Sequence, residues 1–342
     1  MKIILLLSIF SMGESKTLLK MPTAFNTSLP ILGSTVSHLK KQVEESSDGS
    51  LKIKIYAPGK LLPPFEILDG VSTGKVNSGY AISGYWQGKI LSAAIFSSLP
   101  FGPSAPEFLA WLKFGGGMEL YQEMYDKHGY NVKVLACGIS PPESSGWFTK
   151  PIRSIKDLKG LKIRFYGLGG EVMRKLGASP SLIPGGEIFP ALEKKAIDAT
   201  EYSMPVVDQK LGFYKVAKYN YFPGWHQQST VFELLINKKF WKKMSKAHRS
   251  LLEMACNDAI TYSMAQGEAL QFKVMKQFKD KHGVKIKKWS PKMLAQFEKA
   301  WRQVAKDLSA KDPFFKKVYN HLQKFREGYR IWQSHAFLPR KK

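Results

Sequence analysis

The region that decides the fold reads GLKIRFYGLGG at 160–170, LGASPSLIPGGEIFPALEKKAIDATEY at 176–202 and KLGFYKVAKYNYFPGW at 210–225. Its first segment is a short apolar strand that carries Arg164 near its end. The pattern then predicts a short helix over 187–195 and a strand over 196–202. This second strand carries Glu201, three residues after Asp198. The region therefore presents one arginine and one acid, each on a strand.

Upstream of this region, strand and helix patterns alternate along the chain. Strands are predicted over 17–21, 51–56 and 76–83, with helices over 31–46 and 65–72 between them. A proline-containing loop over 138–146 predicts a passage into a second domain, with the return near residue 228. Alternating strands and helices are typical of an α/β protein whose parallel strands end at a ligand-binding crevice.

A long helix is predicted in the last third of the chain. Residues 245–281 contain no proline and one glycine, Gly267, and apolar residues recur along them. Such a helix reaches about 55 Å at 1.5 Å per residue, which is more than one domain needs. Two further helix starts are predicted at Ser290-Pro291 and Asp312-Pro313, because proline suits the first helical position.

The whole chain sets further bounds. Its 342 residues suffice for two domains of about 150 residues each. Lys2, an apolar run over 3–10 and small or polar residues after it predict a short signal peptide over 1–16, with a buried first strand as the alternative. Cys137 and Cys256 permit one disulfide, but the sequence does not show that they meet.

Charge and motifs narrow the function classes. The formal net charge is +25, yet the basic residues are scattered and no nucleic-acid-binding motif accompanies them, which favours a basic surface over a nucleic-acid footprint. The glycines of 167–170 lack the third glycine of a dinucleotide fingerprint, because Val172 occupies that position. There is no GxSxG, Walker or HExxH motif, and the seven histidines show no metal-ligand spacing.

Several segments together resemble the solute-binding subunit of TRAP transporters, the tripartite ATP-independent periplasmic transporters (DctP-type). They are PPFEILDGVSTGKV (63–76), SGYWQGK (83–89), KFGGGMELY (113–121), DLKGLKIR (157–164) and the block 184–225. The resemblance extends from about Leu18 to Trp332 and is greatest to the branch that binds α-keto acids such as pyruvate and related 2-hydroxy acids.

The resemblance implies a two-lobe α/β fold, the type II-like periplasmic binding protein, with a hinge and a lobe-spanning helix. We expect lobe I at 17–137 plus 228–265, lobe II at 138–227 plus 280–312, and the long helix at 245–281. A C-terminal helix over 313–342 carries an apolar, mostly aromatic face. It packs either on its own lobe or, as in keto-acid-binding relatives, on a second chain in a swapped homodimer.

The resemblance also implies roles for particular residues. Arg164 would hold the substrate carboxylate, since a guanidinium matches a carboxylate with two parallel donors. Glu201 would be a cation ligand, and Tyr202 would coordinate through its backbone carbonyl. The branch usually has an amide where this chain has Glu143, and an acid where it has Gln227. If both face one cation, the exchange preserves ligands and charge; the alternative is two unrelated surface residues.

Aromatic positions complete the expected site. Tyr85, Trp86, Phe101 and Trp225 match aromatic positions of the family and would wall the cleft, or else belong to the core. The implied function is periplasmic capture of a small monocarboxylate, with bound sodium or calcium, for delivery to a membrane permease. We expect no catalysis and no nucleic-acid partner. A secreted enzyme acting on organic acids and a basic polyanion binder are the alternatives.

Overall fold

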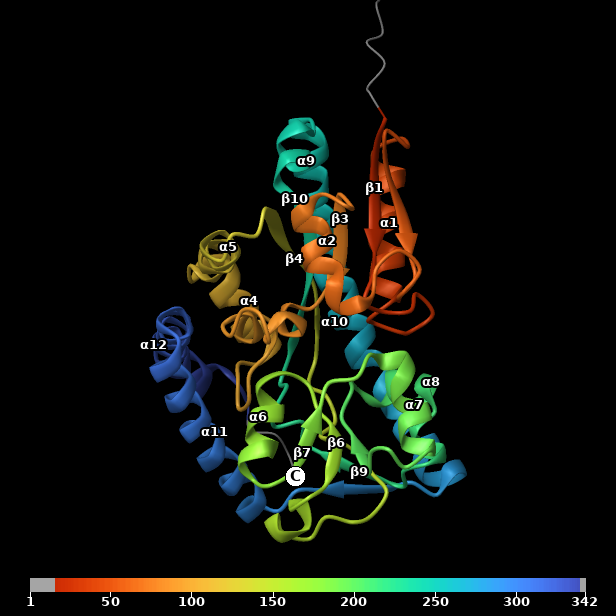
Figure 1. Ribbon diagram of the computed structural model, residues 1–342, viewed down its shortest axis with the longest axis vertical. Helices are drawn as coiled ribbons and strands as arrows, with labels where there is room; N and C mark the ends of the chain where they lie inside the picture. The colour runs from red at the N-terminus through yellow and green to blue at the C-terminus, as the bar shows by residue number, and fades with distance from the viewer. Residues whose placement is uncertain (1–15, 339–342) are drawn as a thin grey trace, which may run out of the picture.

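The computed structural model describes residues 16–338 and forms two lobes stacked along the long axis of the molecule (Figure 1). Lobe I contains strands β1–β4 and β10, and lobe II contains β5–β9 and β11, so the expected two-lobe α/β architecture is present. Apart from Lys16, the signal peptide predicted over 1–16 lies outside the described residues. Among residues 16–338, no helix has both the length and the apolar character required to cross a membrane.

Lobe I contains two small sheets. Strands β1 (Thr17–Pro22) and β2 (Leu51–Tyr56) pair in parallel, with helix α1 (Ser34–Ser46) between them in sequence and packed on β2. The other sheet has the order β3 (Ser78–Ala81), β10 (Thr230–Asn237), β4 (Val132–Ser140) and is antiparallel. The prediction of parallel pairing is therefore right for β1 and β2 and wrong for β3, because β10 returns from lobe II and inserts beside it.

Lobe II is built on one mixed sheet of six short strands. In spatial order they are β11 (Lys285–Lys288), β9 (Tyr219–Phe222), β5 (Gly146–Phe148), β8 (Ala199–Thr200), β6 (Lys162–Arg164) and β7 (Ser179–Ser181). The predicted strand over 196–202 is shorter than expected, and the predicted helix before it is α7 (Gly185–Glu193). Strands β6 and β8 are parallel and place Arg164 opposite Thr200, next to Glu201.

Shorter helices cover these sheets. They are α2 (Ile67–Thr73), α3 (Ala93–Ser97), α4 (Ala105–Phe114), α5 (Gly117–Lys127), α6 (Gly167–Lys175), α8 (Pro205–Leu211) and α9 (Lys238–Lys243). A four-residue 3-10 turn, η2 (Ser83–Trp86), precedes α3 in lobe I. In lobe II, α6 begins directly after Tyr166, where the sequence predicted a turn and a helix start.

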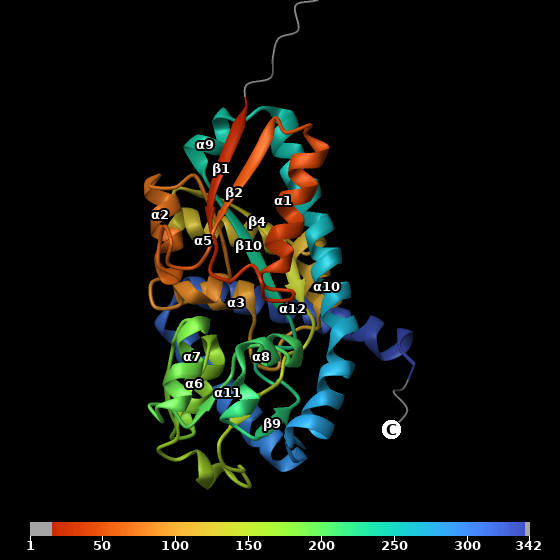
Figure 2. The ribbon, with the colours of Figure 1, turned by 90° about the vertical axis from the view of Figure 1, so that its right-hand side faces the viewer.

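Helix α10 (Lys246–His282) spans both lobes (Figure 2). Its 37 residues pack on β4 and α1 in lobe I and on α8 in lobe II, as the long apolar pattern predicted. Its glycine, Gly267, lies against the crossover loop, where an added Cβ would be 2.4 Å from Pro141 Cδ. A disulfide between Cys137 and Cys256 joins β4 to α10 and answers the question that the sequence left open.

Two helices complete the chain, and both predicted starts are confirmed. Ser290 caps α11 (Pro291–Lys311) and Asp312 caps α12 (Pro313–Ala336), each accepting hydrogen bonds from backbone amides. Helix α12 packs against α3, α4 and α5 of lobe I. Its first half is buried in the same chain through Phe314, Phe315, Val318 and Leu322. Its last turns project from the body, and Ile331 and Trp332 are 70% and 62% exposed (Figure 2).

Candidate functional site

The site is built around Arg164, at the end of β6. Its side chain is almost fully buried, and its Nε donates to the carbonyl of Ile183 at 3.3 Å. Its Nη1 donates to the backbone carbonyl of Glu201 and, at 3.0 Å, to the carboxylate of the same residue. The hydrogen bonds that Arg164 makes to the described residues use Nε and Nη1, and none of them uses Nη2. One prong of a rigid, buried guanidinium is thus available for a further acceptor.

Glu201 follows β8 and is fully buried beside Arg164. Its Oε2 accepts from Arg164 and, at 2.9 Å, from the amide of Tyr166. Its Oε1 has no hydrogen-bond partner among the described residues and lies 3.5 Å from Nε2 of His226. Burial alone would raise the pKa of Glu201, but the positive charge of Arg164 and the contact with His226 hold that pKa below its usual value. Glu201 is therefore an ionised carboxylate with one free oxygen.

Glu143 lies in the crossover from β4 to β5 and supplies the second carboxylate. Its Oε1 accepts a hydrogen bond from Thr230 Oγ1 at 3.1 Å, and Thr230 in turn accepts from the amide of Gln227 at 2.7 Å. Oε2 of Glu143 and Oε1 of Gln227 are buried without protein partners. The alternative that Glu143 and Gln227 are unrelated surface residues is therefore wrong, since both are buried and joined through Thr230.

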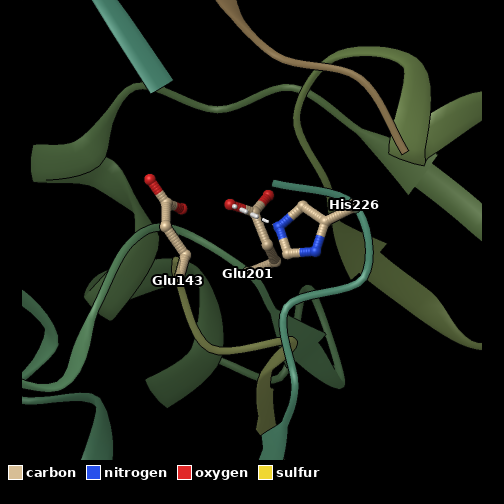
Figure 3. Close-up of side chains that lie close together, drawn as sticks. All are labelled: Glu143, Glu201 and His226. Atoms are coloured by element: carbon tan, nitrogen blue, oxygen red, sulfur yellow. Dashed lines mark ion pairs between the residues drawn. The ribbon is translucent and has the colours of Figure 1, made fainter. Parts of the chain in front are cut away.

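Three of these side chains form a compact cluster (Figure 3). Glu143, Glu201 and His226 each offer one ligand atom, and all three atoms lie within 4.8 Å of one another. Both ring nitrogens of His226 are buried without hydrogen-bond partners among the described residues. The spacing of histidines in the sequence did not reveal His226, because its neighbours come from two other segments; its place directly after the conspicuous Trp225 was the one available signal.

The cluster is strongly acidic for its degree of burial. Burial raises the pKa of Glu143 well above its usual value, and the nearby charges of Glu201 and Asp208 raise it further. Asp208, on α8, accepts from the indole of Trp147 at 2.8 Å, and burial raises its pKa to about 7. No pattern in the sequence singles out Asp208. Unpartnered carboxylate oxygens in a buried position suit a hard cation such as sodium or calcium, whereas imidazole adds a softer ligand.

Tyr85 and Trp225, two of the aromatic residues expected in the cleft walls, both lie near the boundary of the lobes. The ring of Tyr85 packs edge-on against Tyr166, with centroids 5.6 Å apart, and the amide of Tyr166 bonds Glu201 of the cluster. Burial raises the pKa of Tyr85 to about 12. Trp225 stacks between Phe101 of lobe I and Phe297 of lobe II, with ring centroids at 5.9 and 4.7 Å.

Trp86 and Tyr202 also have clear places. The indole of Trp86 donates to Glu233 at 2.7 Å within the core of lobe I, so the structure turns its polar group away from the cluster toward a buried acid. The ring of Tyr202 lies under the guanidinium of Arg164, with its centroid 5.1 Å from Cζ. These two residues support Tyr85 and Arg164 respectively.

A cleft opens between the lobes, although none of the buried residues of the cluster lines it. It has a volume of about 400 Å³ and is lined by Tyr85, Gly84 and Leu91 of lobe I and by Phe165 and Arg174 of lobe II, among others. Tyr85 thus lines the cleft and packs on Tyr166, which bonds Glu201 of the cluster. The site therefore combines a buried arginine, carboxylate oxygens without protein partners among the described residues, and a nearby cleft between the lobes.

Comparison with known proteins identifies the family of the chain. Residues 24–312 match the family described as DctP, bacterial extracellular solute-binding protein, family 7. The chain belongs to this family. It is 35% identical, over 85% of its length and 79% of the relative's, to the monocarboxylate 2-oxoacid-binding periplasmic protein of Nostoc sp.. This family 7 protein is thus a TRAP transporter solute-binding protein, as its sequence resemblance implied.

Solved structures of family 7 relatives superpose closely. A TRAP solute-binding protein of Bordetella bronchiseptica, a mixed-occupancy dimer with calcium and picolinate, has a TM-score of 0.91, 34% identity and coverage of 94% and 95% of the two chains. One from Pseudoalteromonas atlantica, with sodium and pyruvate, has a TM-score of 0.90, 32% identity and coverage of 94% and 97%. A third, from Colwellia psychrerythraea, contains calcium and pyruvate at 32% identity and a TM-score of 0.89, with coverage of 94% and 98%.

Proposed function

We propose that this protein captures a small monocarboxylate with a 2-oxo or 2-hydroxy group, of which pyruvate is the simplest probe, and delivers it to the membrane permease of a TRAP transporter. One observation carries the proposal: buried Arg164, whose Nη2 makes no hydrogen bond to the described residues, pairs with Glu201, and Glu201 and Glu143 each have an unpartnered oxygen in one compact cluster. A carboxylate ligand satisfies the arginine, and its cation satisfies the acids. The ligands of the similar solved structures support both parts.

The cation in this proposal is sodium or calcium, held by Glu143 and Glu201 with the amide oxygen of Gln227 and the backbone carbonyl of Tyr202. Two protein carboxylates around one substrate anion would repel it, and a bound cation removes that repulsion. His226 adds a nitrogen at the edge of the same cluster. Tyr85 lines the cleft on the side of lobe I, and Trp225 packs behind Phe165, which lines it on the side of lobe II.

The proposed function is binding without catalysis, and the proposed location is the periplasm. The periplasmic relative supports this location, and the signal peptide predicted over 1–16 provides the export step. The net charge of +25 attracts small anions to the cleft at low ionic strength.

We also propose that the exposed end of α12 forms a homodimer contact. Ile331, Trp332 and Phe337 are more than half exposed, which a lone chain in water does not favour. The first half of α12 packs on its own lobe, so for that half the first of the two expected arrangements is present. The contact is therefore confined to the last turns of the helix, and the dimeric relative supports it.

Calorimetry with a panel of acids tests the main proposal. Pyruvate, lactate and longer 2-oxo acids should bind with one site per chain in buffer containing sodium or calcium, and sugars and amino acids should not. Mass spectrometry of the recovered ligand should show it chemically unchanged. Binding of a sugar or an amino acid in preference to every carboxylate would refute the proposed ligand class, and turnover of the ligand would favour the enzyme alternative.

A further inference from the structure

We propose that Tyr166 is a positioning residue that couples closure of the two lobes to occupation of the ligand site. The inference rests on the proposed function for the identity of the ligand, and on the contacts of Tyr166 for the coupling. Tyr166 follows Arg164 by two residues, at the point where β6 passes into α6. It is almost fully buried and makes separate contacts toward the site and toward the opposite lobe.

The contact toward the site is made by the backbone. The amide of Tyr166 donates to Oε2 of Glu201 at 2.9 Å, the same oxygen that accepts from Arg164. The position of this carboxylate therefore fixes the start of the Tyr166 backbone. Any ligand or cation that orders Glu201 also orders Tyr166.

The contact toward lobe I is made by the side chain. The hydroxyl of Tyr166 donates to Oγ of Ser97, at the end of α3, at 2.8 Å. Its ring packs edge-on against Tyr85, with centroids 5.6 Å apart. Burial raises the pKa of Tyr166 well above its usual value, so the hydroxyl remains a hydrogen-bond donor at neutral pH. One residue of lobe II is thus seated between two residues of lobe I.

Gly84 provides the seat for the tyrosine hydroxyl. A Cβ added at Gly84 would lie 1.9 Å from Oη of Tyr166 and 2.4 Å from its Cζ, distances that no packed structure tolerates. The backbone of Gly84 has no positive φ, so the need for glycine comes from this close approach alone. The position is specific for a closed arrangement in which Tyr166 reaches η2.

The burial of the cluster makes this seat functionally relevant. Arg164, Glu201 and Glu143 are each at most 3% exposed, so a ligand enters or leaves only when the lobes separate. Separation withdraws Tyr166 from Gly84 and Ser97. The Tyr166–Ser97 hydrogen bond is therefore lost on opening and regained on closure, and it acts on ligand release more than on ligand entry.

The first test measures the rates of pyruvate binding to full-length variants. Tyr166→Phe removes only the hydroxyl and should raise the dissociation rate about 2- to 12-fold, the effect of one neutral hydrogen bond, with little change in the association rate. Ser97→Ala should have the same effect, and the double variant should add little to either. Tyr221→Phe is the matched control, because its hydroxyl bonds Ile152 within lobe II; it should lower thermal stability without changing the dissociation rate.

The second test uses the seat itself. Gly84→Ala should weaken pyruvate binding about 5- to 150-fold, the cost of forcing a methyl group into a packed contact. In a chain that already carries Tyr166→Ala, the same Gly84 change should have almost no effect, because the blocking ring is gone. Gly88→Ala is the control: Gly88 lines the same cleft, and an added Cβ there meets nothing within 4 Å.

The outcomes distinguish a failure of the coupling role of Tyr166 from a failure of the proposed ligand class. If wild type binds pyruvate but Tyr166→Phe and Ser97→Ala both dissociate at the wild-type rate, the coupling role is wrong. If wild type binds no acid, the proposed ligand class is wrong, and X-ray scattering in solution tests the coupling role of Tyr166 on its own. Gly84→Ala should then give a wider molecule than wild type, and adding Tyr166→Ala should return it to wild-type dimensions. Identical scattering from all variants would show that Tyr166 has no coupling role.

Discussion

Replacing Arg164 separates its two interactions, with the protein and with the ligand. Arg164→Ala removes the positive partner of Glu201, which is fully buried and ionised. Breaking a buried pair by removing one member costs about 3–5 kcal/mol, so the free energy of unfolding of the ligand-free protein should fall by that amount. The substitution should also remove the partner of the ligand carboxylate, which costs about 2–5 kcal/mol, or roughly 30- to 4,000-fold in affinity.

Arg164→Lys distinguishes the two effects. An ammonium group can still neutralise Glu201, so much of the stability should be retained. It cannot bond Ile183, Glu201 and a ligand carboxylate at once in the planar geometry of a guanidinium, so pyruvate binding should still fall by at least about tenfold. Urea unfolding of the ligand-free chain measures the first quantity, and calorimetry with pyruvate measures the second.

The matched control is Arg174→Ala, which removes the same charge from an exposed position in the outer cleft, where Arg174 pairs with Glu171 at 3.5 Å. It should leave the unfolding free energy nearly unchanged and change affinity by less than about threefold, as expected of a solvated pair. If Arg164→Lys binds pyruvate as tightly as wild type, Arg164 serves Glu201 alone, and the ligand carboxylate is held elsewhere.

Four further outcomes are expected. Glu143→Gln introduces the amide that the sequence resemblance implies at this position and should keep pyruvate binding, whereas Glu143→Ala should weaken it by at least about tenfold in calorimetry. Chelation followed by dialysis into sodium-free buffer should weaken pyruvate binding, and unchanged affinity would show that the acids do not face the ligand. Burial raises the pKa of Glu233 from 4.5 to about 7, so the folded state binds a proton more tightly than the unfolded chain, and the contribution of Glu233 to the unfolding free energy should fall by about 3 kcal/mol from pH 4.5 to pH 7. In urea titrations, Glu233→Gln should remove this contribution and leave those of Asp208 and Glu143, whose pKa values burial also raises. Deletion of 330–342 should give a monomer by light scattering without loss of the fold, and a dimer that survives this deletion places the contact elsewhere.

The parts of the fold that local chemistry determines were predictable from the sequence. The helix starts at Ser290-Pro291 and Asp312-Pro313 follow from capping, and the length of α10 follows from an uninterrupted helical pattern. The pairing of β3 with β10 was not predictable, because it joins segments that are about 150 residues apart and depends on how the chain returns from lobe II.

The residues of the site also divide into those that the sequence predicted and those that only the folded structure reveals. Arg164 and Glu201 stand out in sequence because each falls on a predicted strand within a recognisable block. In the structure Glu201 directly follows β8, and the parallel pairing of β6 and β8 brings the two residues together. The position of His226 in the cluster depends on three segments meeting, which spacing along one segment cannot reveal. Trp86 matched an aromatic position of the family, but only packing shows that its indole bonds Glu233.

The disulfide between Cys137 and Cys256 determines what happens when a protease cuts the chain. These residues are 119 positions apart, and β5 through β9 lie between them. The strands of lobe II other than β11 therefore belong to a loop closed at its base by a covalent bond. A protease that cuts once between residues 138 and 255 leaves a molecule of unchanged mass on a non-reducing gel, and two fragments appear only after reduction. Surface loops of lobe II can thus be nicked during the life of the protein without releasing either half.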